Sequence, residues 1–202
     1  ATGIPFAETQ AGRSAIVWDH PLNLGGLGVT GCAAANALAR EADVILGVGT
    51  RYTDFTTSSK WLFREDARFV NLNVSEFQSY KLDAVAVIAD AKQALPVLQQ
   101  ALAGYQAPYT DEITRAKDAW SAEMDRLCRT VWSEHDIPEI NDSNSGSIAR
   151  FASDLHASLT QTSVVAAINE AMAPEDVVIG AAGSLPGDLQ RMWRAKARDT
   201  YN

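Results

Sequence analysis

The chain has 202 residues, of which 47% are hydrophobic and 21% charged, and its formal net charge is −8. This composition is typical of a globular protein with a substantial core. The negative charge argues against nucleic acid as a partner, because nucleic acids are bound by basic patches. No apolar run approaches the roughly 18 residues that span a bilayer, so no membrane segment is expected. The two cysteines and three histidines are too scattered to predict a metal site.

The first hundred residues alternate strand-like and helical patterns, as a doubly wound parallel-sheet α/β domain requires. The run 44–48 is apolar without alternation, which is typical of a parallel strand covered on both faces. Asp90 is the expected N-cap of a later helix with one apolar stripe. In chain order the sequence predicts a strand at 4–8, a helix at 32–42, strands at 44–48, 69–74 and 84–89, and a helix at 91–103.

The glycine-rich segment before the first helix contains Gly26-Leu27-Gly28-Val29-Thr30-Gly31, a literal match to the dinucleotide fingerprint. That fingerprint requires a hydrophobic strand directly before it and an acidic residue about 20 positions after it. Residues 19–23 read instead as a loop, and Asp43 comes too early. We therefore expect a glycine-permitted loop against a sheet, or a non-Rossmann ligand site, with Thr30 capping the next helix.

The second half begins with apolar residues at spacings of three and four, which predict one long amphipathic helix over 108–135. Its tryptophans are interpreted as packing residues. The polar, breaker-rich stretch 136–146 is typical of an interdomain linker. Helical periodicity returns at 160–172, and residues 177–180 are expected to form a short buried strand.

These patterns divide the chain into three parts. Residues 1–107 are expected to be a Rossmann-like domain, and residues 108–158 a long helix and interdomain linker. Residues 159–202 are expected to be the start of a second α/β domain.

Three segments carry a resemblance to a known family: TQAGR at 9–13, DHPLNLGGLGVTG at 19–31 and AANALAREADVILGVGTRYTDFTT at 34–57. They closely resemble the central domain of thiamine-diphosphate enzymes of the acetolactate synthase type. The segment AAGSLPGDL at 181–189 narrows the likeness to members that open the ring of a cyclic 1,2-dione in myo-inositol catabolism. The alternatives are an acetolactate synthase-like carboligase or a non-catalytic structural or nucleotide-binding domain.

The resemblance implies a longer enzyme with pyrimidine-binding, central and diphosphate-binding domains, of which this chain would be part of the second and the opening of the third. That enzyme would use thiamine diphosphate and Mg²⁺, act on a small cyclic dione in the cytoplasm, and form a homo-oligomer, a dimer or tetramer. The family's activating glutamate and metal-binding segment would lie outside these residues. We therefore expect no catalytic and no metal-binding residue here, and no activity from the chain alone.

Two sites follow from the resemblance. Gly183 and Ser184 would contact the diphosphate of thiamine diphosphate, because backbone N–H groups and a hydroxyl at a strand end suit phosphate oxygens. Gly28, Gly49 and Arg51 match positions that help to hold FAD in acetolactate synthases, and they predict a crevice for a nucleotide or anion. FAD is doubtful, because residues 71–74 replace the more acidic strand end of those flavin binders. Pairing of Arg51 with Asp54 is the alternative to a bound anion.

Overall fold

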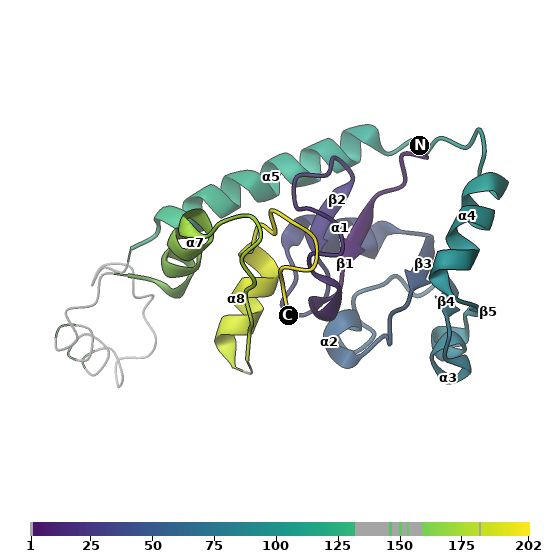
Figure 1. Cartoon of the computed structure of the whole chain (residues 1–202), viewed down its shortest axis with the longest axis horizontal. Coiled ribbons are helices and arrows are strands. Elements are labelled where there is room, and N and C mark those ends of the chain that lie inside the picture. The colour runs from purple at the N-terminus through teal and green to yellow at the C-terminus, as the bar shows by residue number, and fades with distance from the viewer. Residues whose placement is uncertain (1, 132–145, 147–149, 151–152, 154–158, 182) are drawn as a thin grey trace.

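Figure 1 shows the computed structural model of the chain, which describes residues 2–131, 146, 150, 153, 159–181 and 183–202. The strands pair in parallel and form two separate sheets rather than one, and the described residues also include an isolated antiparallel bridge between Val131 and Leu159. The expected α/β class with parallel strands is confirmed. The first sheet pairs β1 (Phe6–Glu8) with β2 (Asn23–Gly26), and the second has the order β3 (Val44–Val48), β4 (Arg68–Asn73), β5 (Val85–Ile88).

Helices follow the strands and also form much of the described part of the second half. They are α1 (Ala33–Glu41), α2 (Asp54–Thr57), α3 (Glu76–Ser79), α4 (Ala91–Ala101), α5 (Thr110–Arg129), α7 (Gln161–Ala171) and α8 (Ser184–Met192), with short 3₁₀ turns η1 (Gln10–Gly12) and η2 (Lys81–Asp83). Within the described ranges, no helix is both long and apolar enough to cross a membrane.

The helix caps test the local predictions. The Asp90 side chain accepts a hydrogen bond from the Lys92 N–H and caps α4, as expected. The prediction for Thr30 is wrong. Cys32 is the N-cap of α1 and makes no side-chain cap bond, while the Thr30 hydroxyl hydrogen-bonds the Gln190 side chain. The Thr30 hydroxyl therefore binds Gln190 of α8, which is distant in the sequence, instead of capping α1.

Helix α5 contributes to two hydrophobic cores. Ile113, near its start, packs with residues of β2 and α1, whereas Met124, near its end, packs with residues of α7, α8 and the C-terminal segment. Trp120 lies between them and contacts both cores, which confirms its interpretation as a packing residue. Figure 1 shows α5 extending from the region of β1, β2 and α1 to α7. The domain boundaries after residues 107 and 158 stay a prediction.

The three-stranded sheet has one apolar face that the chain leaves largely exposed. We call it the open face; its residues are Val44, Leu46 and Val48 of β3, Val70 and Leu72 of β4, and Val85 and Val87 of β5, which the strand register places side by side. Those of β3 and β5 are exposed, and only Leu72 is buried. The expectation that residues 44–48 are covered on both faces is therefore wrong for this chain. On the opposite face, the rings of Tyr52 and Phe63 contact Phe69.

Two further predictions need correction. Residues 23–26, read as part of a loop and a glycine-rich segment, form β2, a strand directly before the glycine loop. Residues 177–180 make only an isolated parallel bridge, Val178 to Tyr201, and Val177 and Ile179 are exposed. The Val178 N–H donates to Thr200 O (2.9 Å) and the Asn202 N–H donates to Val178 O (3.0 Å), so this segment pairs with the C-terminal residues. The linker predicted at 136–146 lies almost wholly outside the described residues.

Candidate functional site

The glycine loop of residues 26–31 joins β2 to α1, and its backbone polar groups bond within the chain. A Cβ at Gly28, which has φ +111°, would lie 2.2 Å from Phe55 O, so glycine here permits close packing on α2. This geometry favours a packed loop over a phosphate cradle. The bonds run from Leu27 N–H to Glu8 O, from the Gln190 amide to Leu27 O, from Val29 N–H to Phe55 O, and between the Asn36 side chain and both backbone groups of Gly28.

Gly49 and Arg51 lie after the carboxyl end of β3, where a site in an open α/β sheet is expected. Asn73, at the end of β4, organises this edge: its amide donates to Thr50 O (3.0 Å), and its own carbonyl accepts from the Ala89 N–H after β5 (3.2 Å). Arg51 is exposed, and its carbonyl accepts a bond from Lys81 Nζ (2.7 Å). Among the described residues it forms no ion pair with Asp54, so that alternative is not realised.

The glycines of the predicted crevice differ in how much space surrounds them. Gly28 is packed against Phe55 of α2. A Cβ added at Gly49 would have no atom within 4 Å, so the space around Gly49 is open. At the carboxyl end of β3, Gly49 has open space beside it and Arg51 is exposed. Nucleotide or anion binding by Gly28, Gly49 and Arg51 stays a prediction.

Gly183 and Ser184 lie at the amino end of α8, as a phosphate-binding position requires. Gly183 has φ +121° and ψ −160°, a region that residues with a Cβ rarely adopt, so glycine is required by the backbone itself. No side chain caps this end of α8. The Ser184 hydroxyl donates to Gln161 Oε1 (3.3 Å), and the Gln161 amide donates to Asp188 Oδ2 (2.6 Å). These residues fit a diphosphate, because uncapped N–H groups and an exposed hydroxyl meet at one helix end.

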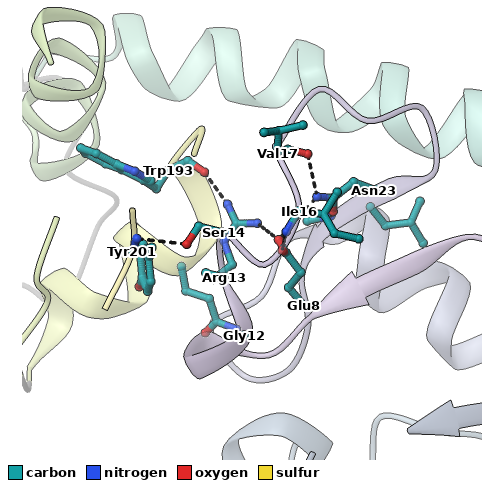
Figure 2. Close-up of polar contacts among 12 residues, drawn as sticks. Glu8, Gly12, Arg13, Ser14, Ile16, Val17, Asn23, Trp193 and Tyr201 are labelled. Atoms are coloured by element: carbon teal, nitrogen blue, oxygen red, sulfur yellow. Dashed lines mark hydrogen bonds and ion pairs between the residues drawn. The ribbon is translucent and has the colours of Figure 1, made fainter. Parts of the chain in front are cut away.

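Sequence reasoning missed a buried polar cluster around Arg13, which Figure 2 shows. Arg13 Nη1 lies 2.7 Å from Glu8 Oε2, both side chains are about 95% buried, at 4% and 5% exposure, and Arg13 Nη2 donates to Trp193 O. The other Glu8 oxygen accepts from the Ile16 N–H (3.2 Å). The charge pair therefore joins β1 to the segment after α8, 180 positions away.

Ser14 extends this connection along the C-terminal segment. Its hydroxyl accepts hydrogen bonds from the N–H groups of Thr200 (3.1 Å) and Tyr201 (3.0 Å), and its carbonyl accepts from Asp199 (3.1 Å). Arg13 and Ser14 stand next to one another in the loop after η1, and both are buried. The only sequence signal was the segment TQAGR, which carried a family resemblance but gave no partner for the arginine.

Metal binding is not indicated by the structure. Across the residues that are described, no group of three or more His, Cys, Asp or Glu side chains is placed to hold a metal ion. The two cysteines are free thiols, one buried and one half-buried.

Comparisons with known proteins agree with this architecture. Residues 1–98 match the family model described as thiamine pyrophosphate enzyme, central domain. The chain is 51% identical, over 98% of its length, to the 3D-(3,5/4)-trihydroxycyclohexane-1,2-dione hydrolase of Geobacillus thermodenitrificans (strain NG80-2), of which it covers 31%. It is also 51% identical to the protein of that name from Bacillus thuringiensis (strain Al Hakam), of which it covers 32%.

The chain therefore spans about a third of the length of the curated relatives that it matches. The family match covers both parallel sheets and ends within α4, while the identity to the two relatives extends through α5, α7 and α8. From these findings we conclude that residues 1–98 are part of a thiamine pyrophosphate enzyme central domain, and that the rest of the chain is similar to the segment that follows in the same relatives.

Proposed function

We propose that the protein containing this chain is a thiamine-diphosphate-dependent hydrolase that opens the ring of 3D-trihydroxycyclohexane-1,2-dione by C–C cleavage and yields 5-deoxy-glucuronate. The observation that carries the proposal is the 51% identity over 98% of the chain to relatives named for that hydrolase activity. The proposal includes Mg²⁺ as a second cofactor, a cytoplasmic location and assembly as a homo-oligomer. It includes no nucleic acid or membrane partner.

When bound, thiamine diphosphate supplies the nucleophile and the electron sink for C–C cleavage. The part proposed for this chain is to hold the diphosphate end. The uncapped amino end of α8 offers N–H groups and positive helix-dipole potential, and Ser184 adds a hydroxyl donor. Asp188, one turn further along, is a negative charge near this position, and its carboxylate is engaged by Gln161 and by Arg191 at 3.7 Å. Those contacts limit its repulsion of a diphosphate.

The test is a titration of thiamine diphosphate into the full-length protein with the ring-opening rate as readout. Ser184→Ala should weaken cofactor affinity about ten- to a hundredfold, because a hydrogen bond to a charged group is lost. The rate at saturating cofactor should change little, since a contact to the diphosphate tail holds ground state and transition state alike. Gly183→Val should have a larger effect, because valine cannot adopt this backbone conformation without strain.

Gln161→Ala is the matched control. It leaves the Ser184 hydroxyl in place and removes the amide that binds Asp188, so cofactor affinity should fall less than in Ser184→Ala. A Ser184→Ala variant with normal cofactor affinity and a large loss of maximal rate would show that the role assigned to this loop is wrong. Condensation of pyruvate in place of ring opening by the full-length protein would favour a carboligase instead.

A further inference from the structure

A cavity of about 310 Å³ lies where the N-terminal and C-terminal parts of the chain meet, apart from the amino end of α8. Its walls are the loop between β1 and β2, the middle of α5, and residues 191–194 at the end of α8 and just after it. Ser184 is at the opposite end of α8, a helix of nine residues, which is roughly 13 Å long at 1.5 Å per residue. The volume is at the lower end of the range for small-molecule sites.

The cavity walls are positively charged in an acidic protein. Four basic side chains and one acidic side chain, Asp19, are among the described residues that line the cavity, whereas the whole chain has a net charge of −8. The basic residues are Arg13, Lys117, Arg191 and Arg194. Even with Arg13 neutralised by Glu8, three cations face one carboxylate.

Two of these arginines have hydrogen-bonding capacity that the described part of the chain leaves unused. The Nε atoms of Arg13 and Arg191 are buried and have no hydrogen-bond partner there. Arg13 is only 5% exposed, so bulk water does not readily serve this donor. Buried donors are normally satisfied, and an unsatisfied one costs about 1–3 kcal/mol. Both arginines line the cavity, so its wall contains guanidinium groups whose hydrogen-bonding capacity is not fully used within the described residues.

Arg191 and Arg194 are held loosely by protein carboxylates, whereas Lys117 Nζ donates to the carbonyls of His20 and Pro21. Arg191 lies 3.7 Å from Asp188 and Arg194 lies 4.0 Å from Asp125, both longer than a charge-assisted hydrogen bond. The Arg194 guanidinium lies 4.9 Å from the centre of the Trp18 ring, and Trp120 forms another part of the wall. The cavity thus combines aromatic surface with available positive charge.

We propose that this cavity binds a small organic anion, with a carboxylate or phosphate group held by Arg191 and Arg194 and a flat or apolar body against Trp18 and Trp120. Because the walls come from both parts of the chain, a bound anion should also stabilise the contact between them by mass action. The proposal does not depend on the cofactor or the reaction proposed above.

The test uses the full-length protein and four probes: benzoate, phenyl phosphate, inorganic phosphate and the neutral analogue benzamide. Binding is followed by calorimetry and by tryptophan fluorescence, since Trp18, Trp120 and Trp193 line the cavity. Benzoate or phenyl phosphate should bind at least about tenfold more tightly than benzamide, because charge-assisted hydrogen bonds are lost with the neutral probe. The tighter of these two anions identifies the preferred group. Phenyl phosphate should also bind more tightly than inorganic phosphate, which has no body to pack on the tryptophans.

Arg194→Gln should weaken binding of the better anion about tenfold, and Arg191→Gln should do the same. Arg115→Gln is the matched control, because Arg115 is an exposed residue of the same α5 wall helix outside the cavity lining, and it should leave the affinity unchanged. Equal binding of benzamide and benzoate, no binding of either organic anion, or an equal loss in Arg115→Gln would overturn the proposal. The comparison of charged and neutral probes needs no variant, so it holds even if a substitution disturbs folding.

Discussion

The two parallel sheets of the chain differ in how completely they are covered. The pair β1 and β2 lies beneath α5 and beside α1, and its Asn23, Leu24 and Gly26 are buried. The buried Arg13–Glu8 pair also ties it to the segment after α8. The sheet of β3, β4 and β5 keeps the open face, although parallel sheets are normally covered on both faces. The comparison teaches that this chain covers the first sheet with its own residues and leaves one face of the second sheet largely exposed.

The largest expected effect on the free energy of unfolding comes from breaking the buried Arg13–Glu8 ion pair, which connects the first sheet to the segment after α8. Arg13→Ala should lower the free energy of unfolding by about 3–5 kcal/mol, because it leaves the Glu8 carboxylate buried without its charge partner. Arg126→Ala is the control. It removes an exposed pair with Glu123 and should leave the stability of the chain unchanged within error. Urea denaturation measures both, and similar small losses in the two variants would show that the buried pair does not hold the sheet.

A leucine in each sheet gives a matched second comparison. Leu24 of β2 is 6% exposed and Leu46 of β3 is 45% exposed. Leu24→Ala should cost about 2–5 kcal/mol in unfolding free energy, because it leaves a cavity in a packed core. In the 202-residue chain, Leu46→Ala should cost less than about 1 kcal/mol, as is usual for partly exposed sites. If the longer protein covers the open face, the cost of Leu46→Ala should rise there, and an equal cost in both proteins would show that the face stays uncovered.

Sequence periodicity predicted the helices and strands that have a clear apolar spacing or a cap of their own. The ranges of β3, β4, α4 and α5 follow from apolar spacing and from a cap at Asp90, and the structure confirms them to within a few residues at most ends. The strand β2 was missed because Asn23-Leu24-Gly25-Gly26 has little strand propensity. Its pairing with β1 and the packing of α1 determine its conformation instead. An apolar run also cannot distinguish a strand buried in the chain itself from one that is buried only in a larger assembly.

The sequence pointed to candidate site residues but not to their surroundings. The turn at Gly183 and Ser184 was predicted to follow a strand, and the helix α8 that begins there was not predicted. The hydrogen bond of Ser184 to Gln161 joins segments 23 residues apart. The cluster around Arg13 and the cavity beside it depend on contacts across most of the chain, from Glu8 to Trp193. No local pattern encodes such pairings. Only the structure places the four basic residues of the cavity together.

A third prediction concerns association through the open face. Leu46→Lys should reduce concentration-dependent association of the 202-residue chain, measured by light scattering, because it places a charge in the middle of an exposed apolar surface. The substitution lowers the net negative charge, which by itself would favour association. Gln93→Lys makes the same charge change on exposed α4 and should not reduce association. Equal behaviour of the two variants would mean that the open face does not drive association.

The smallest expected effect is on thiol reactivity, which reports local opening without changing stability. Cys32 is fully buried under the first sheet, and its thiol donates to Leu24 O at 2.9 Å. Burial raises the pKa of the Cys32 thiol, so less of the reactive thiolate is present at any pH below that pKa. Cys128, near the end of α5, is only half-buried. At pH 8 a chromogenic disulfide reagent should therefore modify Cys128 quickly and Cys32 slowly.

A Cys128→Ser variant isolates the slow reaction of Cys32. Its rate should increase when Arg13→Ala is added, because weakening the tie to the C-terminal segment allows the region of β1 and β2 to open more often. Leu46→Ala lies in the other sheet and should leave the rate unchanged. If both substitutions accelerated the reaction equally, the two sheets would open together, and the difference in their cover would not correspond to a difference in their local stability.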